Sequence, residues 1–288
     1  MGTIAGRAEA LLGTAVVATS PVAGGDICVA TRLRLSDGTS AIMKTRAHAP
    51  ADFFRAEADG LAWLAEAGGA PTPDVLAVED DCIILRYVEH GRVTNEAAEA
   101  FGRALATTHN AGSPVFGNER GDTYIGSLPM PNRPADGWPE FFATRRILPY
   151  LKLAVDRGGV QPSDAQAIEQ VVRRITELAG PDEAPSRLHG DLWSGNVLWG
   201  HDGVVHLIDP AAYGGHRETD LAMLALFGLP NLQRVLEAYR EASPLADGWE
   251  QRVGLHQLFP LLTHATHRVG GGAYGARAGD TARALLRS

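Results

Sequence analysis

The feature that most constrains the fold is a polar octapeptide followed at short range by an aspartate. His189-Gly-Asp-Leu-Trp-Ser-Gly-Asn196 precedes two short apolar runs, 197–199 and 204–208, separated by Gly200-His-Asp-Gly203. These runs predict a β-hairpin, and Asp209 follows its second strand directly. An aspartate, an asparagine five residues later and a second aspartate after a hairpin form the layout that kinase-like folds use for phosphoryl transfer.

The chemistry of phosphoryl transfer explains these residue types. One carboxylate must orient the acceptor hydroxyl and accept its proton, while an amide oxygen and a second carboxylate hold Mg²⁺ against the nucleotide phosphates. We therefore predict Asp191 as the catalytic base, with Asn196 and Asp209 as magnesium ligands. The alternative is an ordinary turn with two capping residues, which the complete octapeptide disfavours.

A second signal comes from the first third of the chain. Alternating apolar residues predict strands joined by a hairpin turn, followed by a helix over about residues 51–67. Glu57 lies within the apolar stripe of that helix, where an unpaired charge would be costly. Lys44, at the end of the preceding strand, is the candidate partner. Kinase folds use such a pair to position nucleotide phosphates, so we predict that both residues bind ATP, unless they are separate surface charges.

Two further segments are assigned to the nucleotide by their order along the chain. Gly24 and Gly25 lie in a loop between predicted strands, where glycine allows the backbone to approach the phosphates closely. Arg86, Tyr87 and Val88 form the expected connector between the two parts of the fold. Backbone groups of this connector are predicted to bind the adenine ring.

These patterns predict an α+β, two-lobed protein-kinase-like fold. The small β-rich N-terminal lobe would span residues 1–88, and a larger, mostly helical C-terminal lobe residues 89–288. Strands are expected at 29–35, 41–44, 75–78 and 82–85, and helices at 95–109, 138–157, 163–179, 218–227 and 232–242. The glycine- and proline-rich segment 112–137 is expected to be a long functional loop.

Composition excludes several classes of function. The chain carries 26 lysines and arginines against 34 acidic residues, a net charge of −8, which argues against nucleic-acid binding. No apolar run approaches the roughly 18 residues needed to cross a bilayer, so no membrane association is expected. Cys28 and Cys82 lack the spacing of a metal site and are expected to be reduced thiols in a cytoplasmic protein.

Differences from the protein kinases indicate a small-molecule acceptor. Gly190 replaces the arginine that a phosphorylated activation loop would need, and Trp193 stands where protein kinases place a lysine. Pro210 and Ala211 follow Asp209 in place of Phe-Gly. Because an aromatic face can pack on a sugar or an alkyl amine, we predict that Trp193 and the 112–137 segment contribute to the acceptor pocket.

The chain resembles the fructosamine kinase (ketosamine 3-kinase) family, a branch of the aminoglycoside phosphotransferase and choline kinase group. The resemblance extends from about residue 20 to the C-terminus. It is most specific in Leu188-His-Gly-Asp-Leu-Trp-Ser-Gly-Asn196 and in Ile208-Asp-Pro-Ala-Ala-Tyr-Gly-Gly-His-Arg-Glu-Thr-Asp-Leu-Ala-Met223. It implies an enzyme that uses ATP and Mg²⁺ to phosphorylate the 3-hydroxyl of a small or protein-bound ketosamine, with a role in deglycation. We expect a monomer or weak dimer.

Two alternative functions remain open. A kinase of the same fold could act on an aminoglycoside, choline or another sugar, or the chain could be a catalytically inactive nucleotide-binding module. Retention of the complete set of predicted catalytic and nucleotide-binding residues argues against the inactive module. A structural role is expected for three residues of the second motif, with Asp220 beginning a helix and Arg217 and Glu218 forming ion pairs around the loop. His109 and His189 are expected to pack and to form hydrogen bonds.

Overall fold

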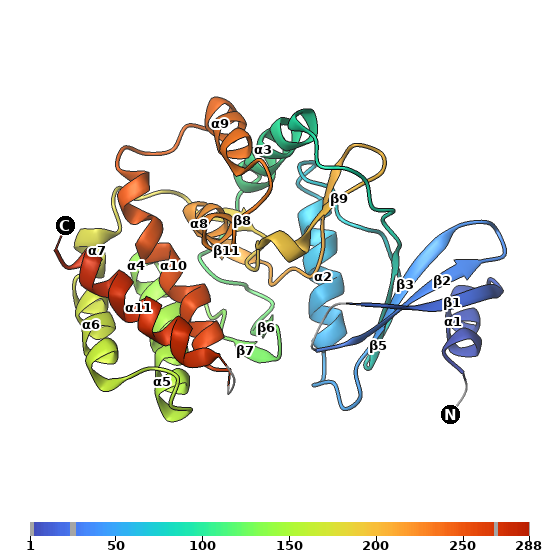
Figure 1. The fold of residues 1–288 in the computed structure, drawn as a ribbon, viewed down its shortest axis with the longest axis horizontal. Coiled ribbons are helices and arrows are strands. Elements are labelled where there is room, and N and C mark those ends of the chain that lie inside the picture. Colours follow the sequence, from blue (N-terminus) through green and yellow to red (C-terminus); the bar gives the residue numbers. More distant parts are fainter. Residues whose placement is uncertain (1–2, 24–26, 268–269, 288) are drawn as a thin grey trace.

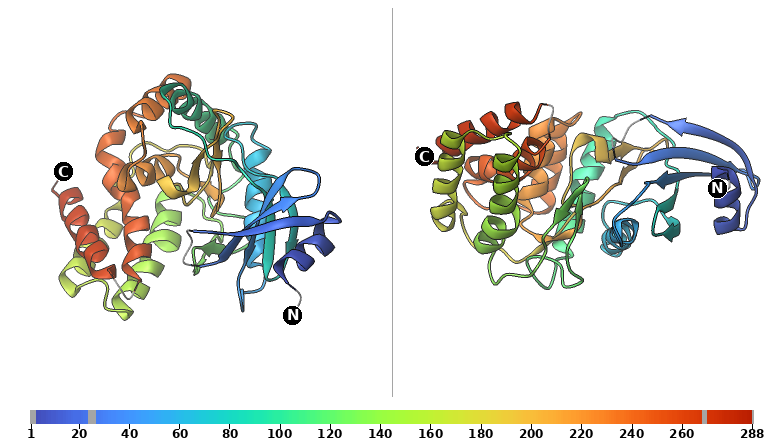
Figure 2. Two further views of the ribbon diagram at one scale, coloured as in Figure 1. Left: turned by 45° about the vertical axis from the view of Figure 1, so that its right-hand side comes forward. Right: turned by 90° about the horizontal axis from the view of Figure 1, so that it is seen from below.

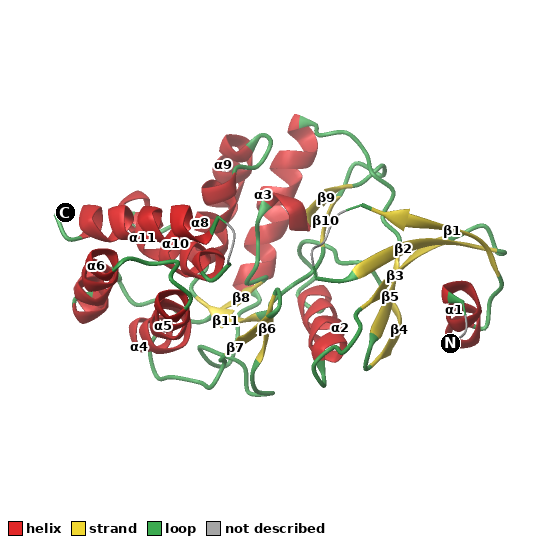
Figure 3. Cartoon of the chain, turned by 60° about the horizontal axis from the view of Figure 1, so that its bottom comes forward, coloured by secondary structure: helices red, strands yellow, loops and turns green. Residues whose placement is uncertain are grey.

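The computed structural model describes residues 3–23, 27–267 and 270–287, and shows a sheet-rich part joined to a larger helical part (Figure 1). The sheet is antiparallel with strand order β1-β2-β3-β5-β4. Its strands are β1 (Val16–Val22), β2 (Val29–Leu35), β3 (Ser40–Thr45), β4 (Val75–Glu79) and β5 (Cys82–Arg86). Helices α1 (Ile4–Leu12) and α2 (Phe53–Ala65) lie on either side of it (Figure 3).

The alternation of side chains along the strands explains this layering. On β5, Cys82 and Ile84 pack in a cluster with α1, whereas Ile83 and Leu85 pack in a second cluster with α2. Successive residues of a strand point to opposite faces of the sheet, so two adjacent apolar pairs can serve two helices. On β3, Ile42 belongs to the α2 cluster, and the same alternation directs Lys44 toward α2.

Helix α2 also packs closely against the helical part of the molecule. A Cβ atom on Gly60 would lie 3.3 Å from both Pro210 Cγ and Ala212 Cβ, so glycine permits this approach. At the C-terminal end of the helix, the Arg187 guanidinium lies 4.6 Å from the Trp63 ring centroid and donates a hydrogen bond to the Trp63 carbonyl. The helix is therefore fixed to the segments that carry the octapeptide and Asp209.

The helical part is built from packed pairs of helices around two apolar clusters (Figure 2). Helix α3 (Asn95–Asn110) packs on α9 (Leu232–Ala242), and α10 (Trp249–Ala265) packs on both α8 (Glu218–Phe227) and α11 (Gly271–Leu285). Two short antiparallel pairs cross this part, β8 (Ser186–Leu188) with β11 (Tyr213–Gly215) and β9 (Val197–Trp199) with β10 (Val205–Leu207). The α+β, kinase-like arrangement predicted from the sequence is thus confirmed.

Three predicted segments differ in detail. The 112–137 segment contains a hairpin, β6 (Thr123–Ile125) and β7 (Leu128–Met130), and the helix predicted over 163–179 is interrupted at Arg174 between α6 (Pro162–Arg173) and α7 (Ile175–Leu178). The helix predicted over 138–157 consists of α4 (Trp138–Phe141), a π-helical turn η1 (Phe142–Ile147) and α5 (Leu148–Asp156). The π-helical turn contains the buried Arg146, which donates hydrogen bonds of 2.6 Å to Pro131 O and Asn132 Oδ1.

The connector between β5 and α3 is held against the β9–β10 turn. Glu89 O accepts a hydrogen bond from His201 N at 2.7 Å, and Gly91 N donates to Trp199 O at the same distance. The predicted boundary between the two lobes, between residues 88 and 89, falls in this connector and stays a prediction.

Candidate active site

The octapeptide forms the loop between β8 and β9 and brings Asp191 and Asn196 together. Asn196 Nδ2 donates to Asp191 O at 2.8 Å and lies 3.2 Å from Asp191 Oδ2. Gly190 has a φ of +81°, and a Cβ atom there would lie only 2.0 Å from Ala211 O. The loop therefore requires glycine at this position, where its backbone passes directly against the segment after Asp209.

The environment of Asp191 makes it a base suited to neutral pH. Burial and the nearby charge of Asp209 raise the pKa of Asp191 to about 7, against the opposing effect of the Asn196 hydrogen bond. A general base is most effective when its pKa lies near the working pH. The geometry thus gives Asp191 the property that its predicted role requires.

Lys44 contacts its predicted partner Glu57 and, in addition, Asp209. Its Nζ atom donates to Glu57 Oε1 at 2.5 Å and to Asp209 Oδ1 at 2.7 Å. Burial acts to lower the pKa of Lys44, but the charges of Glu57 and Asp209 outweigh it and raise this pKa. Burial raises the pKa of Glu57. The sequence-predicted pair is thus in contact, and Asp209 is a third member that the sequence did not associate with it.

Asp209 is directed toward Lys44 by an unusual backbone conformation. Its φ of +53° lies in the left-handed region, which is uncommon for residues other than glycine. Hydrogen bonds on either side hold this turn, from Ile208 N to Asn196 O at 3.1 Å and from Ala211 N to His189 O at 3.0 Å. A strained backbone of this kind persists only where its surroundings fix it, and it is typical of functional sites.

The donor set fits a divalent cation and a phosphorylated ligand. The Nδ2 atom of Asn196 is committed to Asp191, which leaves Oδ1 as the atom that could bind a metal. Lys44 is in contact with two carboxylates, and Asp191 adds a third negative group at the same place. The site therefore has more carboxylates than cations, a balance that Mg²⁺ would correct.

Asp220 contributes to this site in a way that the sequence analysis missed. It was expected to begin a helix, but it is the third residue of α8 and is fully buried. Its Oδ2 and Oδ1 atoms accept hydrogen bonds from His189 N at 2.8 Å and Gly190 N at 3.0 Å. The His109 Nε2 atom lies 3.3 Å from Oδ2. Asp220 is therefore a positioning residue for the loop that carries Asp191.

The structure says less about the other residues that were predicted to bind the nucleotide. Gly24 and Gly25 lie outside the described residues. The N–H group of Arg86 donates to Asp74 O at 2.8 Å, and that of Tyr87 donates to Ser40 O at 3.1 Å, so both are used within the sheet. Val88 follows them in the connector and is partly buried.

Comparison with known proteins places these residues in a family. The sequence model described as fructosamine kinase matches residues 3–288. The chain belongs to the fructosamine kinase family. Among curated relatives, a protein of Thermus thermophilus named probable ketoamine kinase is 35% identical over 89% of this chain and 90% of its own length. A chloroplastic protein of Arabidopsis thaliana named protein-ribulosamine 3-kinase is 32% identical over 87% of this chain and 78% of its own length.

Solved structures support the same assignment and the fold. A crystal structure of a Thermobifida fusca protein assigned to the fructosamine-3-kinases covers 99% of both chains, with a TM-score of 0.93 and 48% identity. The choline kinase LicA of Streptococcus pneumoniae aligns with a TM-score of 0.63 at 16% identity, covering 99% of this chain and 98% of its own. This second similarity shows the fold alone.

In this member of the family, Trp193 of the 189–196 loop begins a row of aromatic rings. Its side chain is exposed, with 41% of the residue accessible. The Phe227 ring lies 6.2 Å from it, His264 lies 5.0 Å from Phe227, and Tyr274 stacks on His264 at 4.8 Å between centroids. These rings come from the loop, α8, α10 and α11, so no local sequence spacing could have revealed the row.

Two further observations concern the cysteines and the length and hydrophobicity of the helices. Cys28 and Cys82 are free thiols, and burial raises the pKa of each. Among the helices of the described residues, none combines the length and the hydrophobicity that a membrane-spanning segment needs.

Proposed function

We propose that this chain is a kinase that uses ATP and Mg²⁺ to phosphorylate the 3-hydroxyl of ketosamines. Membership of the fructosamine kinase family over residues 3–288 is the observation that carries this proposal. It is supported by the arrangement of Asp191, Asn196, Asp209, Lys44 and Glu57, which the fold gathers at the junction of the sheet and the helical part. The name of the Arabidopsis relative specifies a 3-kinase acting on protein-bound ribulosamines.

Each residue of the site has a role in this reaction. ATP supplies the transferred phosphoryl group, and Mg²⁺ neutralises charge that develops on the phosphates. Asn196 and Asp209 would hold the metal, and Lys44, oriented by Glu57, would bind phosphate oxygens. Asp191 would accept the proton of the attacking hydroxyl as the new oxygen–phosphorus bond forms, while the bond from the γ-phosphorus to the β–γ bridging oxygen breaks and ADP leaves. Gly24 and Gly25 would cover the phosphates, and Arg86, Tyr87 and Val88 would contact the adenine ring.

The row of aromatic rings offers the acceptor a flat, largely apolar surface. Trp193 is exposed and follows Asp191 by two residues, so its ring can pack on the sugar or the amine of a ketosamine. Phe227 and His264 extend this surface away from the catalytic loop. Phosphorylation at the 3-hydroxyl gives an unstable product that sheds its sugar, so the role of the reaction is deglycation. We propose a cytoplasmic monomer or weak dimer that acts on small or protein-bound ketosamines.

The deciding experiment measures ATP consumption with Mg²⁺ against a panel of acceptors. The panel contains ribuloselysine, fructoselysine, erythruloselysine, an aminoglycoside and choline, and Asp191→Asn serves as the inactive control. Turnover of the ketosamines alone is expected, and their relative kcat/KM values would rank the sugars. Turnover of only the aminoglycoside or choline would refute the deglycation role while retaining the fold and the catalytic residues.

A further inference from the structure

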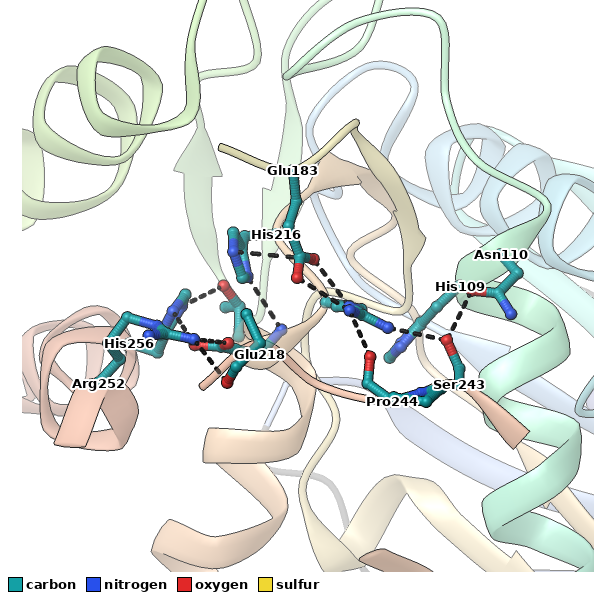
Figure 4. Close-up of polar contacts among 12 residues, drawn as sticks. His109, Asn110, Glu183, His216, Glu218, Ser243, Pro244, Arg252 and His256 are labelled. Atoms are coloured by element: carbon teal, nitrogen blue, oxygen red, sulfur yellow. Dashed lines mark hydrogen bonds and ion pairs between the residues drawn. The ribbon is translucent and has the colours of Figure 1, made fainter. Parts of the chain in front are cut away.

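Three buried side chains of the types that bind metals, His216, Glu218 and His256, lie close together in the helical part (Figure 4). His216 follows β11, Glu218 is the first residue of α8, and His256 lies within α10. Their exposed fractions are 3%, 3% and 0%, and one ligating atom from each lies within 4.8 Å of the other two. The proposed phosphoryl transfer uses none of these residues.

His256 has a ring nitrogen without a hydrogen-bond partner in this cluster. Its Nδ1 atom lies 2.9 Å from Thr219 Oγ1, whereas its buried Nε2 atom makes no hydrogen bond within the described part of the chain. Nε2 lies 3.3 Å from Glu218 Oε2 without hydrogen-bond alignment. A histidine that is held through one ring nitrogen can use the other nitrogen as a metal ligand.

A cavity borders one member of this cluster, His216. Its volume is about 220 Å³, and His216 forms part of its wall. The carboxylates of Asp136, Asp182 and Glu183 also line it, next to the apolar surface of Trp138. This is room for an ion with water molecules, and the acidic lining would attract a cation.

The charges around the cluster leave a negative excess. Glu183 is paired with Arg217, whose Nε atom lies 2.7 Å from Oε2, and Glu218 is paired with Arg252 at 2.6 Å. The two aspartates of the cavity wall form no ion pair with any described residue. Arg217 and Arg252 would compete with a metal ion for Glu183 and Glu218. A carboxylate offers about four lone-pair positions, however, and a guanidinium that donates two hydrogen bonds uses only two of them.

We propose that His216, Glu218 and His256 form a binding site for a divalent transition-metal ion of the zinc class. Two imidazoles and one carboxylate are a zinc donor set, whereas Mg²⁺ prefers oxygen ligands alone, so this site is separate from Asn196 and Asp209. Ligation through His216 Nε2 would move the ring proton to Nδ1 and loosen the 3.3 Å contact from Glu218 N. The ion would tie α10 to α8 two residues before Asp220, and so stabilise the support of the catalytic loop.

A cobalt titration of tag-free, chelator-treated protein tests this proposal directly. Co²⁺ in a site with nitrogen ligands and four or five donors gives intense visible absorption, whereas aqueous Co²⁺ gives weak bands. We expect one equivalent to bind with intense absorption, Zn²⁺ to displace it, and Mg²⁺ in millimolar excess to leave it in place. A titration that yields only the weak aqueous spectrum, or displacement by Mg²⁺, would overturn the proposal.

Variants locate the site. His216→Gln and His256→Gln should each weaken Co²⁺ binding by more than the roughly 10- to 100-fold that loss of an outer hydrogen bond to a ligand costs. His201→Gln, an exposed histidine in the β9–β10 turn, is the matched control and should bind like the parent protein. Unchanged affinity in both cluster variants, or equal loss in the control, contradicts the proposal. Because the parent titration uses no substitution, misfolding of a variant does not prevent the test.

Discussion

Replacing Lys44 by methionine would leave two carboxylates without their shared cation. The Glu57 side chain is only 11% exposed, so it cannot regain solvation and would take up a proton instead. Its ordinary pKa is 4.5. Holding it protonated at pH 7 costs about 1.36 kcal/mol for each of roughly 2.5 pH units, or about 3.4 kcal/mol. This magnitude agrees with the roughly 3–5 kcal/mol measured when one partner of a buried pair is removed.

The sign of the pH dependence follows from the same argument. In the variant, the pKa of Glu57 in the folded state lies above its unfolded value, so the folded state binds more protons at neutral pH. The free energy of unfolding then falls as the pH rises above 4.5. The destabilisation should therefore shrink from about 3.4 kcal/mol at pH 7 to about 0.7 kcal/mol at pH 5.

Urea denaturation at both pH values tests this reasoning. The set comprises the parent protein, Lys44→Met, Glu57→Gln and the double variant, with the exposed Lys152→Met as a control. The double variant should regain most of the stability lost at pH 7, because no buried charge remains on Glu57, but it should not regain kinase activity. Equal destabilisation by Lys44→Met at both pH values, or a double variant as unstable as the sum of the singles, would refute the account.

Four further outcomes are expected. Asp191→Asn should lower turnover at least about 100-fold while ATP binding persists; near-normal turnover would remove Asp191 from its role. Asp220→Ala leaves two buried N–H groups unpaired, so urea denaturation should show a loss of about 2–6 kcal/mol, and a loss below 1 kcal/mol would contradict the positioning role. Trp193→Ala should raise the KM for ketosamines but not for ATP in steady-state assays; an unchanged acceptor KM would remove it from the pocket. Because the pKa of Asp191 is about 7, kcat/KM for the acceptor should rise roughly tenfold per pH unit below that value; a flat profile from about pH 5 to 8 would argue against this base.

The contacts that could be predicted are those governed by local periodicity. Lys44 and Glu57 were paired because helical spacing placed Glu57 in an apolar stripe, where it needs a partner, and Lys44 ends the preceding strand. Asp191 and Asn196 were linked because they belong to one continuous loop. In both cases the two residues lie within 13 positions of each other in the sequence, so the local structure is enough to bring them into contact.

The contacts that could not be predicted join distant segments or depend on backbone irregularities. Asp209 reaches Lys44 across 165 residues and through a left-handed turn, which no periodic pattern encodes. Asp220 was expected to begin a helix because acidic residues are common in first turns, but its tertiary contacts determine its function. The π-helical turn Phe142–Ile147, which contains the buried Arg146, leaves no mark in the spacing of apolar residues. The sequence therefore predicted a single helix over 138–157.

The close packing of α2 on the segment after Asp209 has a consequence for control of the enzyme. A Cβ atom on Gly60 would lie 3.3 Å from side-chain atoms of Pro210 and Ala212, and Arg187 holds the C-terminal end of the helix at Trp63. In a kinase whose glutamate helix can swing away, a signal can activate the enzyme by moving the helix back. Here two contacts C-terminal to Glu57 hold the helix in place while Glu57 contacts Lys44, so the phosphate-binding pair is already assembled. On the proposed function this is fitting, because glycation is spontaneous damage, and its repair would be governed by the supply of damaged molecules alone.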